Sequence, residues 1–426
     1  MMVFTSIYGV VDGLFVSNFA GKTALAAVNL IMPIVMILSS FGMMVGTGGS
    51  ALVAKTMGEG DNWRARRYFT LLVAFGFVVG LVLAVVGWLV MSDLSYLFGA
   101  QGQLHDDSVL YGCMMMLSLP FFILQYAFQS FFVTAGKPKI GFAVIVAAGL
   151  TNIVLDVLLV GVFGMGLFGA ALATNISELV GGLVPVLYFV RRRTASLWFV
   201  RPHMRWNVIG KACVNGSSEM VTNIAMSLVS VLYNMQLLRY IGEDGVAAYG
   251  VIMYTAMVFA SIFIGYSVGA APLLSYQYGA KNHVEMRSLL WKSLGVIGVG
   301  SVIMFLAGQT FAFPLSSIFV GYDQGLLDLT VRAYHIYAFC FLFMGYAIYS
   351  SSFFTALNNG VVSAVISFLR TLVFEVGAVL LLPLVLGIDG IWLSVTIAEI
   401  AACIVAAAFM VGLGKRYGYR KQGMAR

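Results

Sequence analysis

Long apolar stretches alternate with short polar segments along the whole chain. A helix needs about 20 mainly apolar residues to cross the hydrocarbon core of a bilayer. Glycine, proline, asparagine and charged residues separate twelve such stretches, at residues 1–20, 26–54, 68–92, 108–134, 140–162, 167–190, 207–240, 247–277, 288–314, 329–356, 361–386 and 390–414. The pattern therefore predicts an all-α integral membrane protein with about twelve transmembrane helices.

The second half of the chain repeats the first half at an offset of 221 residues, which is the separation of Gly21 from Gly242. The register holds without a gap, and it also aligns Gly48 with Gly269, Gly58 with Gly279, Arg66 with Arg287, Gly166 with Gly387 and Glu178 with Glu399. A duplicated scaffold predicts two pseudo-symmetric lobes of six helices. We expect an N-lobe at 1–190, a cytoplasmic linker at 191–206, a C-lobe at 207–414 and a tail at 415–426.

The same register makes the first helix short. Met1 corresponds to Thr222, so the segment 207–221 has no counterpart in the first half. We expect a natural start upstream of Met1, and a first helix in this chain that barely crosses the bilayer at about 1.5 Å of rise per residue.

Composition and charge support a membrane protein and orient it. Hydrophobic residues make up 61% of the chain and charged residues only 10%, against about 25% charged in a soluble domain. Lysine and arginine gather after the second, fourth, sixth and eighth spans and in the tail, which predicts that these segments and both termini are cytoplasmic. The net charge of +7 is spread over separate loops, so it indicates topology and not nucleic-acid binding. We expect a multi-pass protein of the bacterial cytoplasmic membrane.

Cysteine and histidine suggest no catalytic or metal chemistry. The four cysteines and four histidines are scattered, and none forms a pair with zinc or redox spacing. A membrane-embedded enzyme should show a clustered catalytic set at one membrane face, and none is visible. We expect no enzymatic activity and no cofactor.

One polar set lies inside the predicted membrane spans. Asp12, Asp156 and Thr174 are each eight or nine residues from an outer glycine turn, which places all three roughly 12 Å below the outer boundary. Asn152 precedes Asp156 by four residues and shares its helix face. Such an oxygen-rich group suits a proton or Na⁺. The alternative is a structural hydrogen-bond cluster between helices.

Only the first half carries this polar set. The equivalent positions in the second half are Tyr233, Val373, Gly377 and Val395. A one-sided polar site in a duplicated scaffold is a transporter pattern.

The second half holds other polar residues within its spans. A candidate second-lobe polar site comprises Glu219, Asn223, Arg370 and Glu375. Glu178 and Glu399 occupy equivalent positions in the repeat, which favours a structural role for both.

Several segments of the chain carry a family resemblance. They are Asp12-Gly-Leu-Phe-Val, the segments 25–33 and 46–58, Ala135-Gly-Lys-Pro, and the segments 269–281 and 382–392. Together they resemble the multidrug and toxic compound extrusion family, and in particular its DinF-like bacterial branch. The resemblance covers the whole chain. It implies two six-helix lobes around a V-shaped cavity, and export of amphipathic, often cationic compounds by a monomer in exchange for H⁺ or Na⁺. It also implies that Asp12, Asn152, Asp156 and Thr174 form the cation site.

A lipid-linked saccharide flippase of a related superfamily is the nearest alternative. Such a protein should have a basic cavity for pyrophosphate, whereas only Arg370 and Arg332 are assigned to spans and not to the flanking basic or outer loops. The sequence leaves the substrate and the choice between H⁺ and Na⁺ open.

Overall fold

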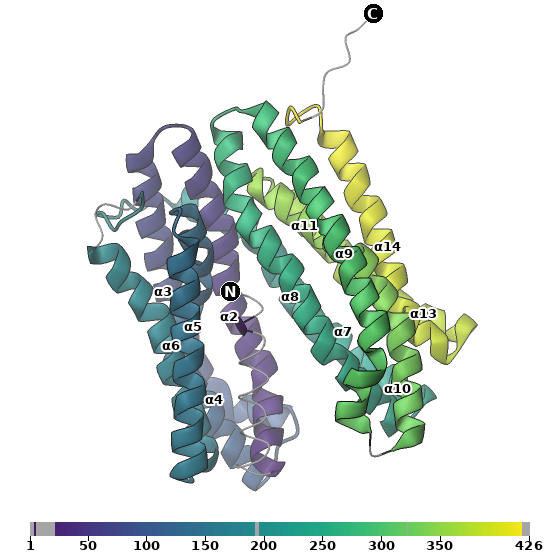
Figure 1. The fold of residues 1–426 in the computed structure, drawn as a ribbon. Helices are drawn as coiled ribbons and strands as arrows, with labels where there is room; N and C mark the ends of the chain where they lie inside the picture. Colours follow the sequence, from purple (N-terminus) through teal and green to yellow (C-terminus); the bar gives the residue numbers. More distant parts are fainter. Residues whose placement is uncertain (1–3, 6–21, 192–195, 322, 420–426) are drawn as a thin grey trace, which may run out of the picture. The chain divides into compact units, whose positions relative to one another are not determined.

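The computed structural model describes residues 4–5, 22–191, 196–321 and 323–419 (Figure 1). Every regular element in these residues is helical. Eleven helices of the described chain are long and apolar enough to cross a membrane, which confirms the all-α membrane fold. The predicted first span at 1–20, together with Asp12, lies outside the described residues apart from positions 4 and 5.

The chain divides into two compact units, Met1–Met220 and Val221–Arg426. Unit 1 contains α2 (Lys22–Gly58), α3 (Asn62–Leu97), α4 (Gln103–Thr134), α5 (Pro138–Leu155), the π-helix η2 (Asp156–Val162), α6 (Gly166–Arg191) and the start of α7 (Trp206–Tyr240). Unit 2 contains the rest of α7, α8 (Glu243–Gly279), α9 (His283–Val320), α10 (Gln324–Tyr337), the 3₁₀ turn η3 (Ala338–Cys340), α11 (Phe341–Ala356), α12 (Gly360–Phe368), the π-helix η4 (Leu369–Glu375), α13 (Val376–Leu386) and α14 (Ile388–Leu413).

The helix bounds repeat at the offset that the sequence predicts. Shifting α2 by 221 residues reproduces both ends of α8, and shifting α3 reproduces the start of α9. The caps repeat as well, because Asp61 accepts a hydrogen bond from the Arg64 N–H at 2.9 Å and Asn282 accepts one from the Glu285 N–H at 3.1 Å. A side-chain oxygen at this position satisfies a backbone N–H that the first helical turn leaves open. The pseudo-symmetry of the two halves is thereby confirmed.

Glycines let the longest helices of unit 1 approach closely. A Cβ atom added at Gly42 of α2 would lie 2.5 Å from the Ile123 carbonyl oxygen of α4, and one at Gly46 would lie 2.9 Å from the Ala127 Cα. Small residues four positions apart allow this close backbone packing. Such packing drives the association of helices within a bilayer, where the apolar lipid tails leave no hydrophobic driving force between helices. The Gly42 and Gly46 face therefore fixes α2 against α4.

Other helix faces are apolar and exposed. On α3, Val82, Val85, Val86 and Leu89 are 51–74% exposed, at the spacing of one helix face. Such a stripe would be unfavourable in water, and in a membrane protein it contacts lipid.

Candidate functional site

Asp156 lies in the interior of unit 1, where α5 changes into a π-helix. Its side chain is fully buried, and it is the first residue of η2. Its backbone N–H still reaches the carbonyl oxygens of Asn152 and Ile153, as in an α-helix or a 3₁₀ turn. The wider π-helical bonds follow, and the Phe163 N–H donates to the Leu158 carbonyl, five residues back, at 2.8 Å. π-helical turns are rare and occur frequently at functional sites. The sequence shows a continuous apolar span here and gives no sign of this change.

Asn152 and Thr174 contact each other across the α5–α6 interface. The Asn152 side-chain amide donates to the Thr174 hydroxyl at 3.5 Å. Nearby, the Ser177 hydroxyl donates to the Ala148 carbonyl at 2.8 Å and so links the same two helices. The structure thus brings Asn152 and Thr174 together. Asp156 lies one helical turn farther along the chain, at the start of η2, which also packs on α6. Asp12, the fourth residue of the predicted set, lies outside the described residues.

Asn152 offers an acceptor to a ligand. Its side chain is 1% exposed, and its Oδ1 accepts no hydrogen bond within the described part of the chain. A buried amide oxygen without a partner costs about 1–3 kcal/mol. Oxygen atoms of this kind, with a carboxylate beside them, are ligands that a proton or a hard cation prefers.

A second polar layer in unit 1 contains two buried glutamines that were not predicted from the sequence. Gln125 and Gln129 of α4 are 2% and 4% exposed and are one helical turn apart. Glu178 of α6 is also buried, and it lies within electrostatic range of Tyr126. The four-residue spacing of two glutamines in an apolar helix was the signal available in the sequence.

Asn175 of α6 does not belong to this polar layer and has a structural role. Its Oδ1 accepts a hydrogen bond from the Ser118 hydroxyl at 2.7 Å, and its Nδ2 donates to the Met114 carbonyl at 2.9 Å. These bonds use both ends of the amide, so Asn175 joins α4 to α6 structurally.

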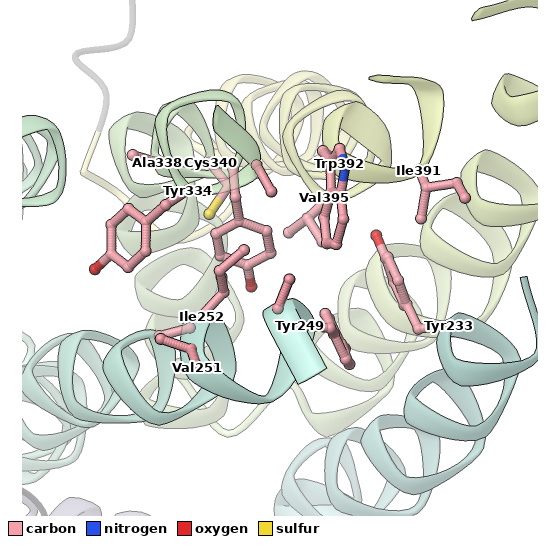
Figure 2. Packing of buried hydrophobic residues seen from close by; sticks show 14 of the residues in the cluster. Tyr233, Tyr249, Val251, Ile252, Tyr334, Ala338, Cys340, Ile391, Trp392 and Val395 are labelled. Atoms are coloured by element: carbon pink, nitrogen blue, oxygen red, sulfur yellow. The ribbon is translucent and has the colours of Figure 1, made fainter. Parts of the chain in front are cut away.

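The equivalent region of unit 2 is an apolar core. Tyr233, at the position equivalent to Asp12, stacks on Tyr249 with ring centroids 4.9 Å apart and planes 7° apart. Figure 2 shows both rings beside Trp392 and Val395, and Val395 is the equivalent of Thr174. Glu375 lies within electrostatic range of both tyrosine rings. This region of unit 2 therefore keeps one carboxylate nearby, but it has Tyr233 and Val395 at the positions of Asp12 and Thr174.

The candidate second-lobe residues have other partners. Arg370 of η4 makes an ion pair with Glu399 of α14, with Nη2 2.6 Å from Oε1 and Nε 3.0 Å from both carboxylate oxygens. Both side chains are largely buried, at 14% and 4% exposure. Glu375 lies within electrostatic range of this pair, whereas Glu219 and Asn223 lie on α7 on either side of the division between the units. The partner of Arg370 is therefore Glu399, a residue for which the repeat predicts a structural role.

Arg332 and Arg370 do not form a basic cavity. Arg332 pairs with Asp389 at 2.7 Å, and Arg370 pairs with Glu399. Each positive charge is matched by a carboxylate, which removes the feature expected of a flippase for pyrophosphate-linked lipids.

Comparisons with known proteins agree with this architecture. The family model MatE matches residues 1–158 and 219–380. The multidrug export protein MepA of Staphylococcus saprophyticus subsp. saprophyticus is 25% identical over 417 residues, covering 96% of this chain and 89% of its own length. MepA of Staphylococcus aureus (strain MRSA252) is 23% identical over 410 residues, with the same two coverages.

Solved structures show the same fold. A MATE transporter in complex with MaL6 superposes with a TM-score of 0.92 at 20% identity, covering 97% of this chain and 95% of that one. The MATE multidrug transporter DinF-BH superposes with a TM-score of 0.88 at 25% identity, covering 99% of this chain and 94% of that one. The chain therefore belongs to the MatE family of multidrug and toxic compound extrusion proteins, and it is a membrane transporter and not an enzyme.

Proposed function

We propose that this protein is a secondary active exporter of amphipathic, cationic small molecules, driven by the entry of H⁺ or Na⁺ through a site at Asp12, Asn152, Asp156 and Thr174. Its two MepA relatives are multidrug export proteins, and this chain is assigned the same substrate class. It needs no cofactor besides the coupling ion.

The buried Asp156 beside the Asn152–Thr174 contact carries this proposal. A charged side chain at the centre of a bilayer costs about 2.5–3.5 kcal/mol on insertion scales, so a fully buried acid requires a role. Binding of a proton or a cation neutralises the carboxylate, and the Asn152 Oδ1 supplies a further oxygen. Loss of the ion restores the charge, and this alternation provides two states that a gradient can drive.

The proposal also includes an orientation and an assembly. The basic loops support cytoplasmic termini in a bacterial cytoplasmic membrane. We assign 1–190 to an N-lobe, 191–206 to a cytoplasmic linker, 207–414 to a C-lobe and 415–426 to a cytoplasmic tail, and we assign a monomer as the working unit.

Transport by reconstituted Asp156→Asn protein tests the proposed role. Asparagine has a similar volume to aspartate but cannot carry the charge, so folding should persist while ion-driven export of a cationic dye from proteoliposomes falls at least tenfold. Ser177→Ala is the matched control, because it removes a buried hydrogen bond between the same two helices but changes no charge. Unchanged export by Asp156→Asn, under pH and Na⁺ gradients applied separately, would contradict the assignment.

A further inference from the structure

A cavity of about 490 Å³ lies in unit 2, among α9, α11 and α14. Both α9 and α14 pack on α11, and the space between them is lined mainly by apolar side chains. The wall includes Leu290 on α9, Tyr346 on α11 and Met410 on α14. Its volume is within the range of about 300–1,000 Å³ that is usual for sites of small molecules.

The repeat explains why this space is open. The positions equivalent to Leu290 and Met410 in unit 1 are Phe69 and Phe189, whose ring centroids are 5.0 Å apart. Phe131 packs on Phe69 at 5.0 Å and completes an aromatic cluster. In unit 2 these two positions hold Leu290 and Met410, which have no ring, and they border the open space together with other side chains that include Trp291 and Tyr346. The ring–ring contact that fills this place in unit 1 is therefore missing in unit 2.

Arg287 lies at the edge of the cavity. The equivalent residue in unit 1, Arg66, already has partners within the protein. Arg66 donates from Nε to the Ser196 carbonyl at 3.1 Å, and its guanidinium lies 3.3 Å above the centre of the Trp198 ring. Arg287, the equivalent residue, lines the cavity and makes no ion pair or ring contact within the described part of the chain. Tyr419, the equivalent of Trp198, instead donates its hydroxyl to the Met410 carbonyl at 2.7 Å.

The surroundings of Arg287 are typical of a membrane–water boundary. Trp291 also lines the cavity and is 64% exposed, and tryptophan is enriched at the level of lipid headgroups. Gly418, in the turn that follows α14, packs against the ring of His283 at the start of α9. That turn also carries Lys415 and Arg416, so further positive charge collects at the same end of unit 2.

We propose that the cavity binds an anionic phospholipid, with the phosphate on Arg287 and an acyl chain along Leu290, Tyr346 and Met410. Basic pockets between transmembrane helices bind anionic headgroups, and the apolar wall suits a hydrocarbon chain. The positive charge at the edge disfavours a cationic export substrate. Lipid bound here would hold α9 to α14, where unit 1 uses its own aromatic side chains.

Thermal melting of the purified full chain in detergent tests the proposal, with dioleoyl phosphatidylglycerol or dioleoyl phosphatidylcholine added. Phosphatidylglycerol should raise the Tm at lower concentration than phosphatidylcholine. Arg287→Gln should weaken the apparent affinity for phosphatidylglycerol about fivefold, the share of one basic residue near a charged headgroup. Arg66→Gln is the matched control and should leave this affinity unchanged.

A second variant tests the cavity itself. Leu290→Phe combined with Met410→Phe copies the rings of unit 1, so it should keep the fold, melt at or above the wild-type Tm without lipid, and lose the response to phosphatidylglycerol. Equal responses of the wild type to the two lipids would overturn the proposal. So would an unchanged preference in both Arg287→Gln and the double phenylalanine variant, or displacement of phosphatidylglycerol by a cationic dye.

Discussion

The Asn152 amide of α5 lies 3.5 Å from the Thr174 hydroxyl of α6, within the half of the molecule that also buries Asp156. This contact joins two helices through groups that can also serve as ligands. The Oδ1 atom of Asn152 remains available, because the amide nitrogen makes the contact. The relationship connects helix packing to ion binding, since whatever occupies the site also acts on the α5–α6 interface.

Thr174→Val should weaken the coupling of cation entry to export more than it lowers the stability of the fold. The substitution keeps the shape of the side chain and removes the hydroxyl, so we expect a loss of about 0.5–1.5 kcal/mol in stability. The cation concentration that gives half-maximal export should rise several-fold. Export assays at varied Na⁺ and varied pH would measure this change.

Thr151→Val provides the control for that experiment. The Thr151 hydroxyl donates to the Ala147 carbonyl of its own helix at 2.7 Å and does not reach α6. An equal rise in the half-maximal cation concentration for Thr151→Val and Thr174→Val would argue against a specific role for Thr174.

The Arg370–Glu399 pair should be a structural requirement of unit 2. Glu399→Gln leaves a buried arginine without its counter-charge, and breaking a buried pair in this way costs about 3–5 kcal/mol. The Tm in detergent should fall strongly. A double change to Arg370→Met and Glu399→Leu should restore most of the loss, because no uncompensated charge remains.

The exposed pair of Arg332 and Asp389 supplies the comparison. Its side chains are 69% and 41% exposed, and such pairs contribute about 0–1 kcal/mol. Arg332→Gln should therefore leave the Tm nearly unchanged. A large effect at Arg332 with a small effect at Glu399 would reverse the roles assigned to the two pairs.

Gly46→Leu should disrupt the contact between α2 and α4. An added side chain would meet the Ala127 backbone, and overpacking of this kind costs about 1–3 kcal/mol. Gly250→Leu on α8 is the control, because a Cβ atom added there meets no described atom within 4 Å. Melting curves of the two variants should differ clearly, and equal losses would show that close helix approach at Gly46 is unimportant.

Cysteine labelling should reveal the proposed orientation. In a variant without native cysteines, Lys281→Cys lies in the exposed turn between α8 and α9, and Gln101→Cys lies in the exposed turn between α3 and α4. An impermeant reagent added outside intact cells should label Gln101→Cys and spare Lys281→Cys. The opposite pattern would invert the topology.

The sequence predicted the helices well because their signals are local. Runs of apolar residues placed the described spans to within several residues, and capping residues such as Asp61 and Asn282 explain why the same boundaries recur in both halves. The repeat register also located the apolar counterpart of the polar set, with Val395 in place of Thr174.

The features that were missed depend on contacts between helices. The π-helix that begins at Asp156 changes which residues face α6, and no local pattern announces it. The Arg370–Glu399 pair joins residues on different helices, so spacing along one helix could not identify it. The cavity beside Met410 is formed by side chains from three helices, so the pattern along one helix could not predict it. In unit 1 the rings of Phe69 and Phe189 meet at the equivalent place.

Cation movement during substrate counterflow tests the coupling claim most directly. Proteoliposomes carrying a gradient of a cationic dye, and no initial ion gradient, would be monitored for internal pH and internal Na⁺. The wild-type protein should drive H⁺ or Na⁺ opposite to the dye, and Asp156→Asn should drive neither. Cation movement by Asp156→Asn at the wild-type rate would contradict the coupling role of Asp156.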